Sequence, residues 1–264
     1  MTQFKYCYGP VGSWRLGASL GVDPISRPEK ICDYNCVYCQ LGDCLPAPPD
    51  RAVYVQPQAL GAELDLLKAP ADYLTFSGRG EPTLAANIKE LLFECGRRRT
   101  EKTAIITNAS LIYSEKLRDE LSAFDFVIAK LDAPNAELFN EINRPAPGIC
   151  FDEIVKGLVR FSKGLRGRLA IQTMLIDRNK AYALDFAALY SKISPDEVQL
   201  NTPLRPCPAK PLSRNEMALA CLITGAELKR LGADGIRIIN VYGEETPDVL
   251  PVSAPDTLKR RGKI

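Results

Sequence analysis

The chain has 264 residues, of which 46% are hydrophobic, so it is long enough to bury one large core or two smaller ones. No run approaches the roughly 18 consecutive apolar residues of a membrane-spanning helix, and the first residues lack the pattern of a signal peptide. We therefore expect a cytoplasmic protein without membrane association. The 34 Lys and Arg residues nearly balance 32 Asp and Glu residues, so bulk charge gives no support for binding to nucleic acid.

Two short basic runs interrupt this balance. One covers residues 97–99 and the other covers the tail at residues 259–263. Short charge runs at helix ends and termini are usually solvated. We expect both runs to lie on the surface.

Short apolar runs alternate with helical patterns along the chain. Helical apolar faces, such as the one from Phe151 to Phe161, separate the runs. This order predicts helices that cover a parallel sheet. The predicted strands lie near residues 19–25, 73–77, 104–107, 126–130, 169–176 and 198–201.

Six β–α steps fall short of the eight of a closed barrel, so the fold class expected is α/β, an incomplete (βα)6 TIM-like barrel. Ser213 and Glu216 match a capping box that begins a further helix through about Leu231, and residues 235–242 could add an edge strand. With no repeat or long linker, we expect a single domain over residues 1–264. Its core would cover about residues 15–204, followed by a C-terminal extension at 205–264.

The chain contains nine cysteines and no histidine. Without a secretion signal the cysteines are expected to be reduced, so a dense cluster of them indicates a metal site or catalysis. The absence of histidine removes the commonest general base and the commonest nitrogen ligand. An ordinary hydrolase centre is therefore excluded.

The densest cysteine cluster follows the first predicted strand. Cys32, Cys36 and Cys39 form a C-x3-C-x2-C array, and Cys44 follows five positions later. Soft thiolates select zinc, copper(I) or iron-sulfur clusters, and three thiolates leave one iron of a cubane without a protein ligand. The alternative is a structural zinc site closed by Cys44, although zinc ligands are usually spaced as two pairs.

The remaining cysteines carry less information. Cys7, Cys95, Cys150 and Cys221 lie within or beside hydrophobic patterns, where a free cysteine behaves as a small hydrophobe. Cys207, between two prolines, stays open as a candidate for a functional role.

The cysteine array, with Tyr38 before its third member, resembles the signature of the radical S-adenosylmethionine superfamily. SGRGEPTL at residues 77–84 resembles the Gly-Glu element of that superfamily, with Glu81 at the acidic position. The segments GPVGSWRLGASLGVDP, CVYCQLG, EINRP and VQLNTP are similar to the branch that contains wyosine-type tRNA synthases and uncharacterised iron-sulfur oxidoreductases. The likeness spans about residues 8–213.

The resemblance implies two cofactors, a 4Fe-4S cluster and S-adenosylmethionine. Cys32, Cys36 and Cys39 would bind three irons, and S-adenosylmethionine would chelate the fourth. One electron then cleaves S-adenosylmethionine to methionine and a 5'-deoxyadenosyl radical, which abstracts hydrogen from an unidentified substrate.

The resemblance also implies roles for polar residues in the loops after the strands, where the active sites of such folds gather. Each also has a local structural role as an alternative, such as a turn, cap or packing position. The expected cofactor-binding residues are Tyr38, Gly78, Gly80, Glu81, Asn108, Ser110, Asn201 and Thr202. The polar groups expected near the substrate are Lys130, Asp132, Asn143, Arg144 and Gln172.

The substrate and the reductant are left open. Reduced flavodoxin or ferredoxin is the expected electron donor, and the substrate would be a small molecule, a peptide or tRNA, with tRNA base modification as one option. Wyosine synthases carry further cysteines upstream for a second cluster, whereas only Cys7 precedes Cys32 here. The alternative function is a non-catalytic iron-sulfur or zinc protein in which Cys44 closes the site.

Overall fold

The computed structural model describes residues 4–48 and 50–261, which contain one eight-stranded sheet. The spatial order of the strands follows their order along the chain. β1 and β2 pair antiparallel, and β2 to β8 are parallel. The strands are β1 (Cys7–Ser13), β2 (Gly17–Val22), β3 (Tyr73–Phe76), β4 (Lys102–Thr107), β5 (Phe126–Lys130), β6 (Arg168–Met174), β7 (Glu197–Asn201) and β8 (Arg237–Asn240).

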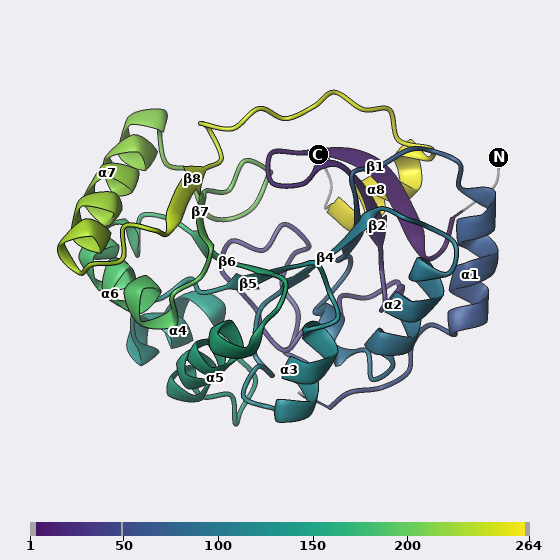
Figure 1. Cartoon of the computed structure of the whole chain (residues 1–264), viewed down its shortest axis with the longest axis horizontal. Coiled ribbons are helices and arrows are strands. Elements are labelled where there is room, and N and C mark those ends of the chain that lie inside the picture. The colour runs from purple at the N-terminus through teal and green to yellow at the C-terminus, as the bar shows by residue number, and fades with distance from the viewer. Residues whose placement is uncertain (1–3, 49, 262–264) are drawn as a thin grey trace.

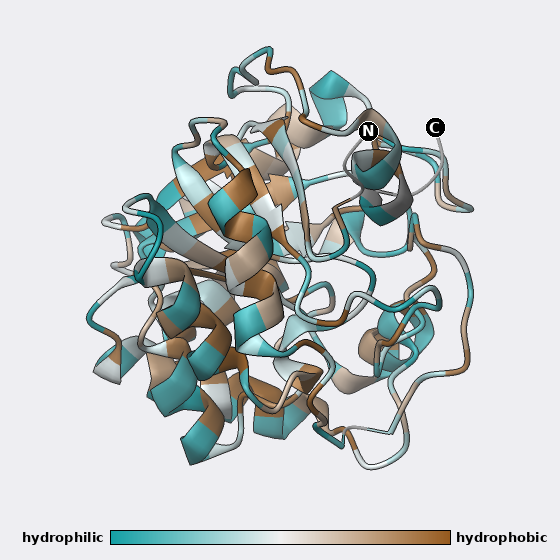
Figure 2. Ribbon diagram, turned by 90° about the vertical axis from the view of Figure 1, so that its right-hand side faces the viewer, coloured by the Kyte–Doolittle hydropathy of each residue, from teal (hydrophilic) through white to brown (hydrophobic). Residues whose placement is uncertain are grey.

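The helices that join the parallel strands lie around the outside of the curved sheet (Figure 1). Together they form a partial TIM-like barrel, which confirms the predicted fold class. Hydrophilic and hydrophobic residues are mixed in the helical layer, as expected for helices with one buried face (Figure 2). The helices are α1 (Pro57–Leu66), α2 (Ile88–Gly96), α3 (Glu115–Leu121), α4 (Ala136–Asn143), α5 (Phe151–Gly164), α6 (Ala183–Ile193), α7 (Arg214–Arg230) and α8 (Ala254–Arg261), with short 3-10 turns η1 (Pro82–Leu84) and η2 (Lys180–Tyr182).

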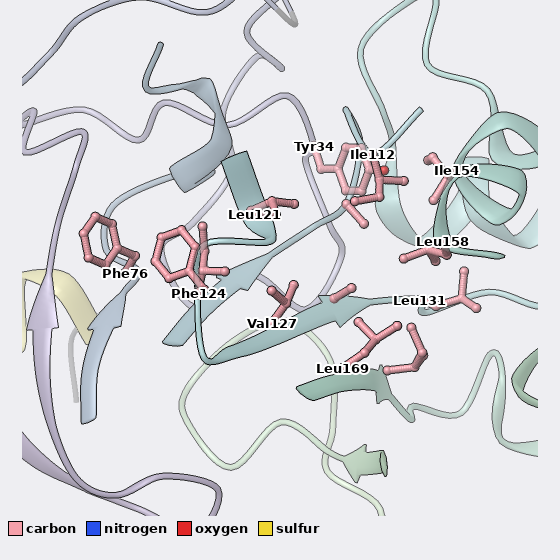
Figure 3. Close-up of a cluster of buried hydrophobic side chains, with 14 of the residues drawn as sticks. Tyr34, Phe76, Ile112, Leu121, Phe124, Val127, Leu131, Ile154, Leu158 and Leu169 are labelled. Atoms are coloured by element: carbon pink, nitrogen blue, oxygen red, sulfur yellow. The ribbon is translucent and has the colours of Figure 1, made fainter. Parts of the chain in front are cut away.

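The two faces of the central strands bury different side chains. Val127 of β5 belongs to the main core between the sheet and the helices, where Leu158 of α5 also lies (Figure 3). Phe126 and Ile128 belong to a small cluster on the other face, inside the barrel, together with Leu16. Because both faces are covered, these strands consist almost entirely of apolar residues.

Neither β1 nor α8 was predicted. β1 contains Gly9, Pro10 and Gly12, which are poor strand formers, and proline is tolerated there because β1 is an edge strand. The predicted edge strand near residues 235–242 is confirmed as β8. The predicted C-terminal helix is confirmed as α7, and its capping box between Ser213 and Glu216 is present.

After β8 the chain crosses from one edge of the sheet to the other, where α8 packs against β1 (Figure 1). The amide of Val252 donates to the carbonyl of Gly9 at 2.7 Å. Of the basic tail run, the structure describes the side chain of Arg260, which is buried, so the expectation of a surface position was wrong there. Lys263 lies outside the described residues.

The surface position expected for the basic run at residues 97–99 was also only partly right. Arg97 is exposed, but the guanidinium of Arg99 donates to the carbonyls of Leu67 at 2.6 Å and Ala69 at 2.8 Å. Arg99 therefore ties the end of α2 to the segment after α1. Within the described residues, no helix is long and apolar enough to cross a membrane.

Candidate active site

A cavity of about 590 Å³ opens at the carboxyl ends of the parallel strands. Cys32, Cys36 and Cys39 line it, and so does Glu81 from the loop after β3. The cysteine loop and the acidic loop, predicted from separate motifs, therefore face the same space.

The backbone of the cysteine loop is held against the end of α4. The amide of Asn35 donates to the carbonyl of Asn143 at 3.0 Å, and the amide of Val37 donates to the carbonyl of Ile142 at 2.9 Å. The last residue of α4 is Asn143, and Arg144 directly after it adopts a left-handed backbone conformation. The helix end thus supplies free carbonyls that fix the loop.

Two side-chain amides point at the cysteine sulfurs. Nδ2 of Asn143 lies 3.4 Å from Sγ of Cys36, and Nδ2 of Asn108 lies 3.8 Å from Sγ of Cys32. Burial, together with nearby Asp132, raises the pKa of Cys36 to about 11, so a metal must displace a proton there. A trio of soft sulfur donors with amide neighbours fits an iron-sulfur cluster.

Cys44 does not join this trio at the cavity. Its amide donates to Oδ1 of Asn35 at 3.2 Å, and its thiol is 3.9 Å from the carbonyl of Tyr34. Over residues 4–48 and 50–261, no three His, Cys, Asp or Glu side chains are grouped closely enough to hold a single metal ion. The geometry therefore gives no support to a zinc site closed by Cys44.

Glu81 is a buried carboxylate that the chain itself holds in place. Its Oε1 accepts hydrogen bonds from the hydroxyls of Thr83 and Thr107, both at 2.6 Å, and its Oε2 accepts one from the amide of Asn108 at 2.7 Å. Burial, with a contribution from nearby Asp33, raises the pKa of Glu81 to about 7 against the pull of these donors. A cationic ligand group beside it would stabilise its charged form.

The glycines before Glu81 bring the acidic loop against the cysteine loop. A Cβ on Gly80 would lie 1.8 Å from the carbonyl oxygen of Ile31, and the amide of Glu81 donates to that same oxygen at 2.9 Å. A Cβ on Gly78 would lie 2.2 Å from Cγ of Asp23. Both glycines line the cavity, but contacts within the chain already require their small size.

A polar network lies beneath the other side of the cysteine loop. The hydroxyl of Tyr38 donates to Asp132, and Nζ of Lys130 lies 3.2 Å from the same carboxylate and 5.2 Å from the centre of the Tyr38 ring. Nδ2 of Asn143 donates to Asp132 at 3.0 Å. Of these four residues, expected to act near the cofactor or the substrate, Tyr38, Lys130 and Asp132 line the cavity.

The other predicted site residues divide into two groups. Asn108, Gln172, Asn201 and Thr202 line the cavity, and the hydroxyl of Thr202 also ties the end of β7 to the carbonyl of Leu175 at 2.9 Å. Ser110 is fully buried, whereas Arg144 is exposed. Neither is among the described residues that line the cavity.

The outer wall of the cavity includes side chains to which the sequence analysis gave no role in the site. Trp14 and Arg15 from the β1–β2 turn, Arg205 after β7 and Arg260 of α8 all line it. Apart from Arg205, which follows β7 by four residues, none of them follows a predicted strand. Trp14 and Arg15 lie in GPVGSWRLGASLGVDP, a segment that the resemblance included, but neither side chain was singled out.

The remaining cysteines mostly match expectation. Cys7 and Cys95 are buried, as predicted for small hydrophobes, and Cys221 is half-buried. Cys150 is exposed, so its predicted hydrophobic role was wrong; it lies just before the first turn of α5, outside the buried face of that helix. Cys207 is half-buried, and its thiol donates to the carbonyl of Ala209 at 3.3 Å.

Comparison with known families defines the class of protein. The family model of the radical SAM superfamily matches residues 28–189, which include the three cavity cysteines and Glu81. The chain belongs to the radical SAM superfamily, whose members use a 4Fe-4S cluster and S-adenosylmethionine. The predicted membership and cofactors are thereby confirmed.

Among individual relatives, the chain is similar to proteins of the UPF0026 group. It is 40% identical over 216 residues to the UPF0026 protein slr1464 of Synechocystis, covering 81% of this chain and 80% of that protein. It is 32% identical over 243 residues to the UPF0026 protein MJ1312 of Methanocaldococcus jannaschii, covering 89% and 75%. A Brachyspira hyodysenteriae protein named GTPase Obg is 39% identical over 225 residues, but the match covers only 33% of that protein and 82% of this chain.

Solved structures share the fold at low sequence identity. Streptococcus suis SuiB bound to S-adenosylmethionine superposes with a TM-score of 0.62 at 17% identity, covering 81% of this chain and 48% of SuiB. TYW1 with a lysine-pyruvate adduct gives a TM-score of 0.60 at 17% identity, covering 80% and 75%. A radical SAM methyltransferase from Sphaerobacter thermophilus gives 0.61 at 18% identity, covering 84% and 65%. The chain thus spans about half the length of SuiB.

Proposed function

We propose that this protein is a radical SAM enzyme in which Cys32, Cys36 and Cys39 hold the cluster and S-adenosylmethionine lies between the cluster and Glu81. The observation that carries the proposal is the close approach of Gly80 to Ile31, which sets the acidic loop directly beside the cysteine loop. When bound, the two cofactors supply one-electron cleavage of the sulfonium carbon–sulfur bond and hydrogen-atom abstraction from a substrate.

The residues of the chain would bind and orient the cofactor. Glu81 would accept a hydrogen bond from its amino group, since the carboxylate is already held in place by four donors. Tyr38 would pack near the adenine, with its hydroxyl anchored on Asp132. Asn108 and the segment Asn201–Thr202, which line the cavity, would supply further polar contacts to the cofactor.

We extend the proposal to the electron donor and to the class of substrate. Reduced flavodoxin or ferredoxin would supply the electron, and Lys130 and Gln172, which both line the cavity, would face a small molecule, a peptide or tRNA. Cys7, upstream of the cysteine loop, is buried in the core, which leaves it unsuited to a second cluster of the kind found in wyosine synthases. One sheet runs through the chain, which supports a single domain.

The test is anaerobic loading of the full chain with iron and sulfide, followed by reduction with dithionite in the presence of S-adenosylmethionine. We expect 5'-deoxyadenosine and methionine to form, and Cys36→Ser to abolish both. Cys95→Ser is the matched control, because Cys95 is a buried cysteine in α2 away from the cavity. A fully loaded wild-type cluster that leaves S-adenosylmethionine intact would contradict the proposal.

A further inference from the structure

The buried ion pair between Arg260 and Asp23 joins residues 237 positions apart in the chain. Nε of Arg260 lies 3.2 Å from Oδ2 of Asp23, and the two side chains are only 7% and 1% exposed. Burying two charges is costly unless they are paired and further hydrogen-bonded. We therefore ask which other groups hold the two side chains and what the ion pair does in the fold.

The remaining donors of Arg260 are satisfied by both ends of the described chain. Its guanidinium donates to the carbonyl of Asp256 at 3.1 Å and to the carbonyl of Lys5. It also lies 5.5 Å from the centre of the Tyr8 ring. Arg260 is thus fixed by α8, by the segment before β1 and by β1 itself.

Asp23 passes this restraint to the acidic loop. Its Oδ2 accepts a long hydrogen bond from the amide of Arg79 at 3.4 Å, and its carboxylate occupies the space that a side chain on Gly78 would need. Asp23 follows directly after β2, and the amide of Ser77 donates to the carbonyl of Val22 at 3.0 Å. The start of the acidic loop therefore packs against Asp23 and the end of β2.

A second route runs through Tyr8. Its hydroxyl lies 2.6 Å from Oγ of Ser77, while the guanidinium of Arg260 lies over its ring. Tyr8, Ser77, Gly78 and Arg260 all line the cavity. Arg260 thus reaches the acidic loop along two sets of contacts, one through buried Asp23 and one through Tyr8 on the cavity wall.

From these contacts we infer that Arg260 and Asp23 are positioning residues that hold the loop from Ser77 to Glu81 in its cofactor-binding shape. The inference rests on the proposed function, because it assigns the loop to S-adenosylmethionine. It also assigns α8, which lies outside the matched segment at residues 28–189, a part in the site. The ion pair acts through the loop and does not touch the reacting atoms.

The test compares Arg260→Gln and Asp23→Asn with Arg98→Gln in the full chain. Arg98 is a matched control, because it pairs with Glu94 at 2.8 Å in the outer helical layer, away from the cavity. The first measurement is hydrogen exchange of the amides at residues 77–81 without cofactors. The second is the dissociation constant of S-adenosylmethionine for the cluster-loaded protein.

We expect Arg260→Gln and Asp23→Asn to exchange faster at residues 77–81 and to bind S-adenosylmethionine about tenfold more weakly, with no further loss in the double variant. Arg98→Gln should change neither quantity. Tyr8→Phe, which removes one hydroxyl, should speed hydrogen exchange at the amide of Ser77. This variant replaces Arg260→Gln and Asp23→Asn in the test if those two do not fold.

Unchanged exchange at residues 77–81 in Arg260→Gln or, failing that, in Tyr8→Phe would overturn the inference. The failure of the proposed function has a different signature. In that case the loaded wild-type protein would not bind S-adenosylmethionine, while the exchange comparison, made without cofactors, would still decide whether the ion pair holds the loop.

Discussion

The side-chain amide of Asn143 bridges Cys36 and Asp132, at 3.4 Å from the sulfur and 3.0 Å from the carboxylate. Asn143 is the last residue of α4, Cys36 belongs to the cysteine loop, and Asp132 follows β5. A single side chain therefore connects three elements around one proposed ligand. It was expected to act on the substrate, but its contacts point to the cluster.

Replacing Asn143 with leucine should lower the reduction potential of the loaded cluster. An N–H donor to a ligating sulfur stabilises the reduced, more negative form, and leucine provides none. A redox titration followed by electron paramagnetic resonance would measure the change. Asn87→Leu is the control, because Asn87 is also buried but donates to the carbonyl of Val55 away from the cysteines. Equal potentials in the wild type and Asn143→Leu would refute the assignment.

The stability of the protein without cofactors should fall as the pH rises from about 4.5 to 7. Burial raises the pKa of Glu81 to about 7, so in this window the folded state retains a proton that the unfolded state has lost. The size of the effect is on the order of 3 kcal/mol. Urea unfolding at several pH values should show a flatter dependence for Glu81→Gln.

The control for this pH dependence is Glu90→Gln, since Glu90 lies on the exposed face of α2. That variant should keep the wild-type slope. An equally steep slope in Glu81→Gln would show that another group carries the effect.

Cys44→Ser should retain the cluster, whereas Cys39→Ser should lose it. The thiol of Cys44 contacts the carbonyl of Tyr34, whereas Cys39 lines the cavity with the two other proposed ligands. Iron and sulfide content after anaerobic loading, with the visible absorption of the cluster, would measure the difference. Loss of iron from Cys44→Ser would instead favour a closed, non-catalytic site.

Leu158→Ala should lower the free energy of unfolding by about 2–5 kcal/mol, because it removes a fully buried side chain between α5 and the sheet. Leu222→Ala in α7 provides the comparison, since Leu222 is 71% exposed. Its effect should stay within about 0.5 kcal/mol. Denaturant unfolding of both variants would measure the difference, and equal losses would mean that the packing in Figure 3 does not limit stability.

The parallel part of the fold could be predicted because its strands are buried on both faces. Runs such as FVIAK at β5 are almost wholly apolar and are separated by helices with one apolar face. The cysteine array and Glu81 could be found because their spacing is local. Contacts within such short motifs leave a pattern in the sequence itself.

The outer wall of the cavity could not be predicted for the opposite reason. Arg260 reaches Asp23 across 237 positions, and nothing local distinguishes it from the solvated arginines of a basic tail. β1 escaped detection because Gly9 and Pro10 weaken its strand pattern. Arg144 illustrates the converse case: it was assigned to the site as a polar residue beside a motif, but it is exposed, follows the last residue of α4 and is not among the described residues that line the cavity.

The crossing of the chain from β8 to α8 has a consequence for biosynthesis. Domains assemble from the N-terminus during translation, so the cysteine loop and Glu81 emerge from the ribosome well before Arg260. We expect nascent chains that lack α8 to form most of the sheet, while the part of the cavity wall that Arg260 provides is still absent. Helix α8 would then complete the wall of the cavity only after the thiols are already in place to receive iron.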